Sequence, residues 1–435
     1  MRLRNFQEID YLLLFSTLAL TTIGILFIYS SGMTTEGISI SNEYRRQLIW
    51  AAAGLTSAVV IAMVNYRRIY DLSRYFYLGT LILLMYTLIF SRVFSGSRWI
   101  RIGAFSFQAS EIAKLTTIVF LAWYLDNTKR SQETLVRFIT SCVIVLVPMV
   151  VVLAQPDLGT SLVFVPILLG MTLIAGVPVR YIFFVSLLVG LAAVLLVLPH
   201  WQATLMNNSI PVLMALTDKK IILAGCLVLS VIAGIALFGY IRYKKRYFYW
   251  IFYAAGILIL ALGTSFAAHQ VLKDYQIMRL IVFLDPNVDP RGSGWHIIQS
   301  ATAIGSGGLF GKGFLHGTQS QYHYLPEQST DFIFAILSEE WGFIGGILVF
   351  LLFLIINLRL IRIMRTTTDS FGSYIVTGLV SMFAFHFLVN VGMTMGIMPI
   401  TGIPLLFVSY GGSALLTAMM GIGLALSIYI RRYDH

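Results

Sequence analysis

Charged residues are scarce in this sequence. Only 11% of its 435 residues are Asp, Glu, Lys or Arg, whereas 58% are hydrophobic. This composition excludes an ordinary soluble domain, because too few polar side chains remain to cover a surface in water. Convincing internal repeats, low-complexity tracts and soluble-domain stretches are missing as well. The sequence therefore predicts one membrane domain over residues 1–435.

Cysteine is also scarce, with two residues in the chain. Cys142 and Cys226 lie in apolar runs, which indicates buried free thiols and says nothing about the redox compartment. No cleavable signal peptide is expected, because Tyr11–Ser30 is long enough to span a bilayer and lacks a clear small-residue cleavage site.

Long apolar runs dominate what is present. They predict an all-α polytopic membrane protein with about 12 transmembrane helices. The net charge is +11. The positions of the basic residues along the chain indicate topology, because cytoplasmic loops of membrane proteins are rich in Lys and Arg. That rule predicts a multi-pass membrane protein with both termini in the cytoplasm. The predicted spans are 11–30, 47–64, 75–90, 111–126, 137–154, 160–177, 178–198, 220–240, 250–269, 331–357, 372–391 and 403–430.

Two loops on the predicted outer side break the charge rule. The first is Ser91–Ser110, and the second, residues 271–330, is a long loop that we expect to be functional because its composition is not that of a disordered segment. Basic residues outside serve no topological purpose, so they indicate an anionic partner. They are Arg92, Arg98, Arg101, Lys273, Arg279, Arg291 and Lys312.

The leading candidate stretch is YLPEQSTDFIFAILSEEWG, residues 324–342. With Ser329 or Thr330 as N-cap, Asp331 would fall in the first turn of an apolar helix. An acid at the boundary between water and hydrocarbon is a functional candidate. Helix capping alone explains it about equally well. Glu327 lies in the same polar stretch.

Two further segments carry charged residues. Glu111 and Lys114 share one helix face, so they form either a structural ion pair or a site where Lys114 meets an anionic headgroup. Ser110 is the expected helix cap, and Trp99 is a candidate interfacial anchor. Asp157 in QPDLGT either caps the next helix or supplies a second carboxylate at the level of Asp331.

Glycine-rich segments complete the candidates. Residues 305–308 and 311–313 are predicted to offer backbone amides to phosphate oxygens, although no P-loop pattern is present. Asn390, residues 396–404 and Ser409–Ser413 indicate a broken helix around a cavity, or glycines used for packing. His296, His316 and His323 lack a metal-ligand spacing, so no zinc site is expected.

Together these segments resemble the SEDS family (shape, elongation, division and sporulation), the polytopic glycosyltransferases that polymerise peptidoglycan. The sequences GWHIIQSATAIGSGGL and HGTQSQ are similar to its elongation branch. The stretches that carry the resemblance are GSRWIRIGAFSFQASEIAKL, QPDLGTSL, DYQIMRLIVFLDPNVDPRGSGWHIIQSATAIGSGGLFGKGFLHGTQSQ, YLPEQSTDFIFAILSEEWG and MGIMPITGIPLLFVSYGGSAL.

The resemblance implies a substrate, a reaction and partners. The substrate is lipid II, and the reaction forms β-1,4-linked glycan and releases undecaprenyl pyrophosphate on the outer face of the bacterial cytoplasmic (inner) membrane. The partners are a class B penicillin-binding protein and an elongation complex that maintains rod shape, with no nucleic acid. The essential acid of the family matches Asp331, its Glu-Lys pair matches Glu111 and Lys114, and its PDLG acid matches Asp157.

The chemistry of this reaction fits these residues. A poorly solvated carboxylate can act as the base for an acceptor hydroxyl. The pyrophosphate needs cations, or a divalent ion such as Mg or Mn whose ligands the sequence does not reveal. The expected substrate-binding residues are Lys114, Glu111, Arg98, Trp99, Arg101, Asp157, Arg279, Lys312, Glu327, Ser409 and Tyr410.

The chain departs from the family at two places, and two other functions remain open. Family members have ten spans, so a helical hairpin is expected to be inserted within residues 178–249, and Ser329 stands where the family often has His. A lipid II flippase or transporter would also suit the broken helices and the span count. A non-enzymatic scaffold that activates a class B penicillin-binding protein is the third alternative.

Overall fold

The structure is a computed structural model, and nearly all of the chain that it describes is helical, which confirms the all-α prediction. The described residues are 9–34, 38, 40–93, 99–102, 105–129, 133–205, 218–271, 274–290, 292–322 and 324–432.

Ten helices within these ranges are long and apolar enough to cross a membrane. The predicted span at 111–126 is also helical, as α4 (Ala109–Asn127), but contains three charged residues. The predicted span at 160–177 is broken into α6 (Leu158–Leu162) and α7 (Phe164–Ile174). The ten helices are α1 (Tyr11–Ser31), α2 (Glu43–Met63), α3 (Arg67–Val93), α5 (Thr134–Ala154), α8 (Val179–Leu205), α10 (Lys219–Tyr243), α11 (Arg246–Val271), α15 (Ile333–Thr366), α16 (Ser370–Thr394) and α17 (Gly412–Ile430).

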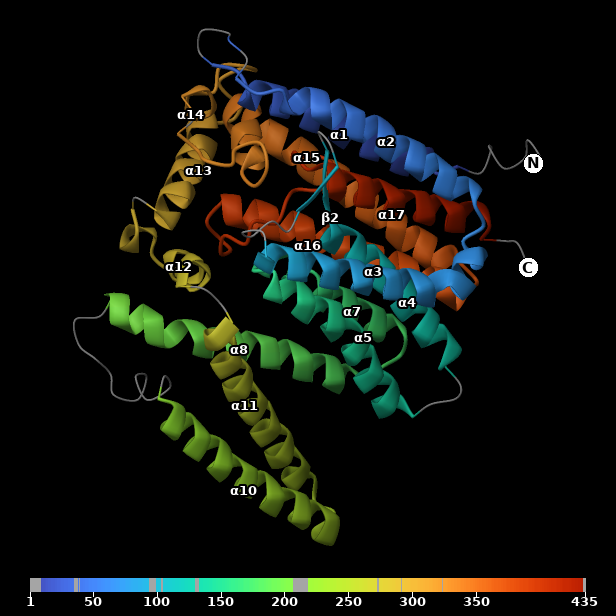
Figure 1. Ribbon diagram of the computed structural model, residues 1–435, viewed down its shortest axis with the longest axis vertical. Helices are drawn as coiled ribbons and strands as arrows, with labels where there is room; N and C mark the ends of the chain where they lie inside the picture. The colour runs from blue at the N-terminus through green and yellow to red at the C-terminus, as the bar shows by residue number, and fades with distance from the viewer. Residues whose placement is uncertain are drawn as a thin grey trace. The chain divides into compact units, whose positions relative to one another are not determined.

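The chain divides into two compact units. The smaller unit is Pro178–Gly294, and it contains α8, α10, α11, α12 (Asp274–Val282) and the short 3-10 helix η2 (Pro286–Val288). Within it, α10 and α11 form a helical hairpin (Figure 1). The segment predicted as an insertion, residues 178–249, lies in this unit.

The larger unit, Met1–Val177 with Trp295–His435, holds the buried core and the leading candidate residues. Helix α17 packs on α2, α15 packs on α1 and α16, and α16 also packs on α4 and α7 (Figure 1). Small residues permit the close approach of α17 to α2, because a side chain at Gly423 would strike the main chain of Ala58.

The cysteines are free thiols, as the sequence predicts. Both Cys142 and Cys226 are partly exposed, however, so the expectation that they are buried is wrong. Each lies on a helix face that the chain itself does not cover completely.

A short β-hairpin lies between α3 and α4, where the sequence predicted only a loop and a helix start. Strands β1 (Trp99–Ile102) and β2 (Phe105–Gln108) pair in antiparallel register, with Trp99 opposite Gln108. Extended backbone at Gln108 ends the strand and makes this residue the N-cap of α4. Ser110 lies inside the helix, so its predicted capping role is wrong.

Helix α15 is kinked at Gly342, whose φ of 65° and ψ of −160° are accessible essentially to glycine alone. The kink frees two main-chain amides, which bond to the glycine-rich stretch instead: Phe343 N donates to Gly308 O at 2.9 Å and Ile344 N to Leu309 O at 3.2 Å. Irregular backbone at membrane depth requires such replacement partners.

The prediction that residues 311–313 offer their amides to a phosphate is wrong. The amides of Lys312 and Gly313 donate to the carbonyls of Glu339 and Glu340, both at 3.0 Å, and Gly311 N donates to Gly307 O at 2.8 Å. These three amides are committed to main-chain partners, so they are not available to a phosphate.

Replacing Gly342 by Ala is expected to destabilise the protein strongly. The backbone conformation alone costs about 1–3 kcal/mol for a residue with a side chain. A Cβ at this position would also lie 2.3 Å from Gly311 N. Thermal unfolding of the purified protein measures the loss. Gly346→Ala is the control, because its Cβ would be in ordinary contact with two side chains, Phe334 at 3.5 Å and Ser338 at 3.7 Å. Equal stability of the two variants would contradict the expectation.

Candidate active site

Asp331 lies in a turn directly before α15 and is partly exposed. The helix begins at Ile333 with Phe332 as N-cap, so the predicted placement of Asp331 in the first turn, behind a Ser329 or Thr330 cap, is wrong. The carbonyl of Glu327 accepts the Asp331 N–H at 3.1 Å and the Thr330 N–H at 3.3 Å. Residues 332–340 that follow are buried, so Asp331 is the last partly exposed residue before the buried part of α15.

Asn390 on α16 holds the main chain of Asp331. Its Nδ2 donates to Asp331 O at 2.9 Å and to Ile403 O at 2.8 Å, and the side chain is fully buried. One amide thus joins the turn before α15 to the irregular segment before α17. This contact fixes the position of Asp331 without using its carboxylate.

Replacing Asn390 by Ala is expected to weaken both stability and activity. Two buried carbonyls lose a donor, which costs about 1–3 kcal/mol. Misplacement of a reacting group by about 1 Å can lower a rate by about 100-fold. Thermal unfolding and glycan synthesis measure the two effects. Asn357→Ala is the control, because its Nδ2 bonds only Phe353 O of its own helix, at 3.0 Å. Equal loss of activity in both variants would remove Asn390 from the site.

Glu111 and Lys114 form the predicted ion pair. Lys114 Nζ lies 2.9 Å from Glu111 Oε1, and the side chains are 4% exposed for Glu111 and 1% for Lys114. Lys114 Nζ also lies 3.0 Å from His386 Nε2, a partner that the sequence analysis missed. His386 Nδ1 lies 3.0 Å from Pro404 O. A carbonyl can only accept, so Nδ1 carries the proton, and Nε2 of the neutral ring accepts from Lys114.

Helix α16 joins this ion pair to Asp331. His386 and Asn390 are four residues apart, so they lie on one helix face about 6 Å apart along the axis. Their carbonyl partners, Pro404 O and Ile403 O, are consecutive in the chain. The buried lysine and the turn that carries Asp331 therefore lie one helical turn apart along α16.

Asp157 has the capping role that the sequence predicts, and its role as a second carboxylate at the level of Asp331 stays a prediction. It caps α6, because its Oδ1 accepts from Thr160 N at 3.2 Å, and its Oδ2 accepts from Gln108 Nε2 at 2.7 Å. The Gln108 main-chain amide in turn donates to Ser413 Oγ at 2.9 Å. A Cβ at Gly159 would lie 2.3 Å from Thr401 O, so this turn packs directly on the segment before α17.

Ser409 and Tyr410 belong to the predicted broken segment, which separates α16 from α17. Ser409 Oγ accepts from Leu405 N at 2.8 Å, and Ser409 O accepts from Gln47 Nε2 at 3.1 Å. Tyr410 N donates to Ser329 O at 2.8 Å. The main chain at these two positions therefore holds the broken segment against the turn that leads to Asp331.

Lys312 is paired with an acid that the sequence analysis did not consider. Its Nζ lies 2.7 Å from Glu339 Oε1, and Glu339 is fully buried. The neighbouring Glu340, also fully buried, accepts from Ser30 Oγ and from Leu315 N. These carboxylates fasten the long loop to α15. Two adjacent acids in an apolar run were a detectable signal, by the same criterion that singled out Glu111.

Helix α13 (Ser293–Gly307) lies in the long loop, and its part from Trp295 onward belongs to the larger unit and packs beside the candidate site. Trp295 Nε1 donates to Tyr324 O at 2.9 Å, and the His296 ring stacks on Phe332 with centroids 5.7 Å apart. The long loop is thus held against both sides of the turn that carries Asp331.

The remaining predicted residues are Arg98, Trp99, Arg101 and Arg279. Trp99 is 39% exposed on the hairpin, and Arg101 lies in β1 opposite Ser106. Arg98 lies outside the described residues. Arg279 lies on α12 in the smaller unit, so its position relative to Asp331 is not defined.

A metal ion would need several His, Cys, Asp or Glu side chains close together. Nowhere among the described residues do three or more such side chains gather in a way that could hold an ion. The described residues thus form no protein cage for a divalent ion, and the metal requirement remains a prediction.

Comparison with known proteins gives close and extensive matches. The family model for FtsW/RodA/SpoVE, described as cell cycle protein, matches residues 11–209 and 210–434. Peptidoglycan glycosyltransferase RodA of Treponema pallidum (strain Nichols) is 49% identical, over 99% of this chain and 100% of its own. Peptidoglycan glycosyltransferase MrdB of Escherichia coli (strain K12) is 33% identical, over 98% of this chain and 94% of its own.

Solved structures match over the same extent. A chain from a structure described as showing structural coordination of polymerization and crosslinking by a peptidoglycan synthase complex superposes with a TM-score of 0.67. It has 25% identity and covers 98% of this chain and 99% of its own. The crystal structure of RodA from Thermus thermophilus matches with a TM-score of 0.61 at 22% identity, covering 98% of each chain, and supports the fold.

Proposed function

Because this chain belongs to the FtsW/RodA/SpoVE family of cell cycle proteins, we propose that it is a peptidoglycan glycosyltransferase that polymerises lipid II during cell elongation. The observation that carries the proposal is the 49% identity to a RodA glycosyltransferase over the full length of both chains. The protein is a multi-pass membrane protein, as its ten long apolar helices require.

Asp331 is the proposed general base. Its carboxylate takes the proton from the acceptor sugar hydroxyl as that oxygen attacks the anomeric carbon of the donor. The new glycosidic bond forms while the bond to the pyrophosphate breaks, so undecaprenyl pyrophosphate leaves with the bonding electron pair. A partly buried position supports this role, because a less solvated carboxylate is a stronger base. Asn390 orients the turn that presents the acid.

Lys114 is the proposed cation at the pyrophosphate end of the site. An ammonium held in a poorly solvated site stabilises developing negative charge more than the same group does in water. Glu111 and His386 hold it by contacts of 2.9 and 3.0 Å. The reaction as proposed passes through no metal ion. An assay with EDTA, and with added Mg²⁺ or Mn²⁺, tests the metal requirement separately.

We also propose the orientation and the partner. The N- and C-termini lie in the cytoplasm and Asp331 lies on the outer side, as the basic clusters favour. A class B penicillin-binding protein in an elongation complex would cross-link the product. The match to a chain from a peptidoglycan synthase complex supports this partner.

The test is reconstitution with labelled lipid II. The purified protein is assayed alone and with a class B penicillin-binding protein, and the same preparation is assayed for lipid II movement across liposomes. Glycan polymer that requires this protein is the expected result. Lipid II movement without polymer would instead identify a flippase. The third outcome is that polymer forms only with the partner, and that acid-to-amide variants of this protein support it as well as the wild type does. That result would identify a scaffold.

A further inference from the structure

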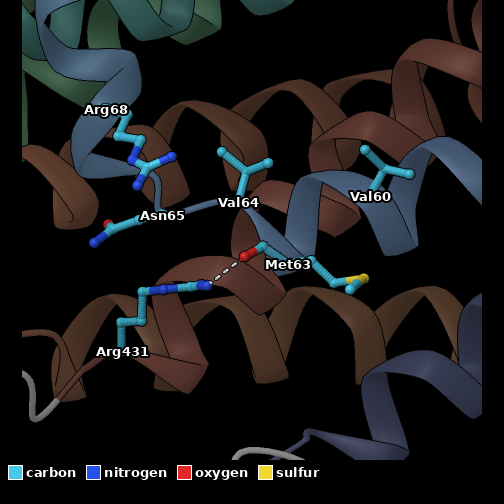
Figure 2. Close-up of a pocket in the computed structure, with 6 residues that line it drawn as sticks. All are labelled: Val60, Met63, Val64, Asn65, Arg68 and Arg431. Atoms are coloured by element: carbon cyan, nitrogen blue, oxygen red, sulfur yellow. Dashed lines mark hydrogen bonds between the residues drawn. The ribbon is translucent and has the colours of Figure 1, made fainter. Parts of the chain in front are cut away.

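A pocket lies in the larger unit, where α2 and α17 end. Its volume is about 530 Å³, and it is lined by Val60, Met63, Val64, Asn65, Arg68 and Arg431. Figure 2 shows Arg68 and Arg431 on opposite sides of the pocket, with Asn65 and Val64 between them. Two cations thus face a space whose other walls are mostly apolar.

The two arginines are held differently. Arg431 donates to Met63 O at 2.7 Å (Figure 2). It also donates to Ala62 O, at 3.0 Å, and to Ser427 of α17. These contacts fix its guanidinium at the pocket wall. Arg68, on the first turn of α3, is exposed and forms no ion pair with any residue that the structure describes. No acidic side chain is among the residues that line the pocket.

An apolar groove continues from this pocket. Its volume is about 160 Å³, and it shares Met63 and Arg431 with the pocket. Its other walls include Leu55 and Val59 of α2 and Leu426 of α17. Val59 and Val60 are more than half exposed, at 51% and 53%, so this face of α2 is not covered by the chain. The groove runs along a helix that is long enough to span the membrane.

We propose that the pocket and groove bind an anionic phospholipid of the cytoplasmic leaflet. The phosphate lies between Arg68 and Arg431, and one acyl chain lies in the groove along α2 and α17. Basic pockets at the cytoplasmic ends of membrane helices suit lipid headgroups of this charge. The apolar groove suits an acyl chain, which free phosphate lacks. The exposed guanidinium of Arg68 suits an anion, which a purely apolar partner lacks.

The experiment uses the full-length protein in phosphatidylcholine vesicles that contain a trace of photoactivatable phosphatidylglycerol or phosphatidylcholine, with the reactive group on the acyl chain. Mass spectrometry locates the cross-links. Phosphatidylglycerol is expected to label residues of the groove, such as those from Leu55 to Met63, in preference to phosphatidylcholine. Because one basic residue near an anionic lipid is worth about a fivefold change in affinity, Arg68→Gln is expected to lower this preference about fivefold.

Two further variants make the result specific. Arg365→Gln removes an exposed arginine of α15 that does not line the pocket, and it is expected to leave the labelling unchanged. Val59→Trp fills the groove from an exposed position and is expected to reduce labelling by both lipids. Equal labelling by the two lipids in the wild type, or equal effects of the Arg68 and Arg365 variants, would overturn the proposal. Loss of labelling when inorganic phosphate is added at constant ionic strength would identify a phosphate site instead.

Discussion

Polymerisation of lipid II is expected to fall by about 10²–10⁴-fold when Asp331 is replaced by Asn, which is the range that general base catalysis contributes. The amide has nearly the same shape as the carboxylate but cannot take up the acceptor proton. The fold is expected to survive, because the Asn390 contact uses the main-chain carbonyl of Asp331 and not its side chain. The measurement is glycan product formed from labelled lipid II by purified, folded protein, with and without the penicillin-binding partner.

Glu327→Gln is the matched control for this experiment. It removes a carboxylate four residues earlier in the same turn, while the Glu327 carbonyl that accepts from Asp331 N is retained. We expect a much smaller loss, because Glu327 is proposed to contact substrate and not to take the proton. Full polymerisation by a folded Asp331→Asn variant would remove Asp331 from catalysis. Attention would then move to Asp157, another carboxylate among the predicted site residues.

The features that the sequence predicted best depend on neighbours along the chain. Hydropathy identified the long helices, and the spacing of Glu111 and Lys114 identified an ion pair that the structure confirms at 2.9 Å. The cap at Asp157 and the broken segment before α17 followed from Pro and Gly in the same way. Each of these features is set within a few residues, so a pattern in the sequence is sufficient.

The features that were missed depend on contacts between distant segments. His386 meets Lys114 across 272 residues of sequence, and Ser30 meets Glu340 across 310. The kink at Gly342 is stable because Gly308 and Leu309 accept the amides that it frees. The end of α15 nearest Asp331 was also misplaced by two residues, since Phe332 and not a polar residue occupies the N-cap. Tertiary hydrogen bonds decided these points, and no local pattern encodes their partners.

Replacing Lys114 by Met is expected to destabilise the protein by about 3–5 kcal/mol, because Glu111 is left as an uncompensated buried charge. The double variant Glu111→Gln/Lys114→Met removes both charges and is expected to regain most of that loss in thermal unfolding. Polymerisation is expected to stay lost in the double variant, since Lys114 is the proposed cation for the pyrophosphate.

The ion pair between Asp10 and Arg359 provides the control for this pair of variants. It joins α15 to the residue that caps α1 at a distance of 2.7 Å, and Asp10 is at least as buried as Glu111. Asp10→Asn/Arg359→Met is expected to retain both stability and polymerisation, because no contact connects this pair to the turn of Asp331 in the described part of the chain. If the Glu111/Lys114 double variant also polymerises lipid II normally, then the buried pair is structural only. The cation for the pyrophosphate must in that case come from the basic residues of the outer loops.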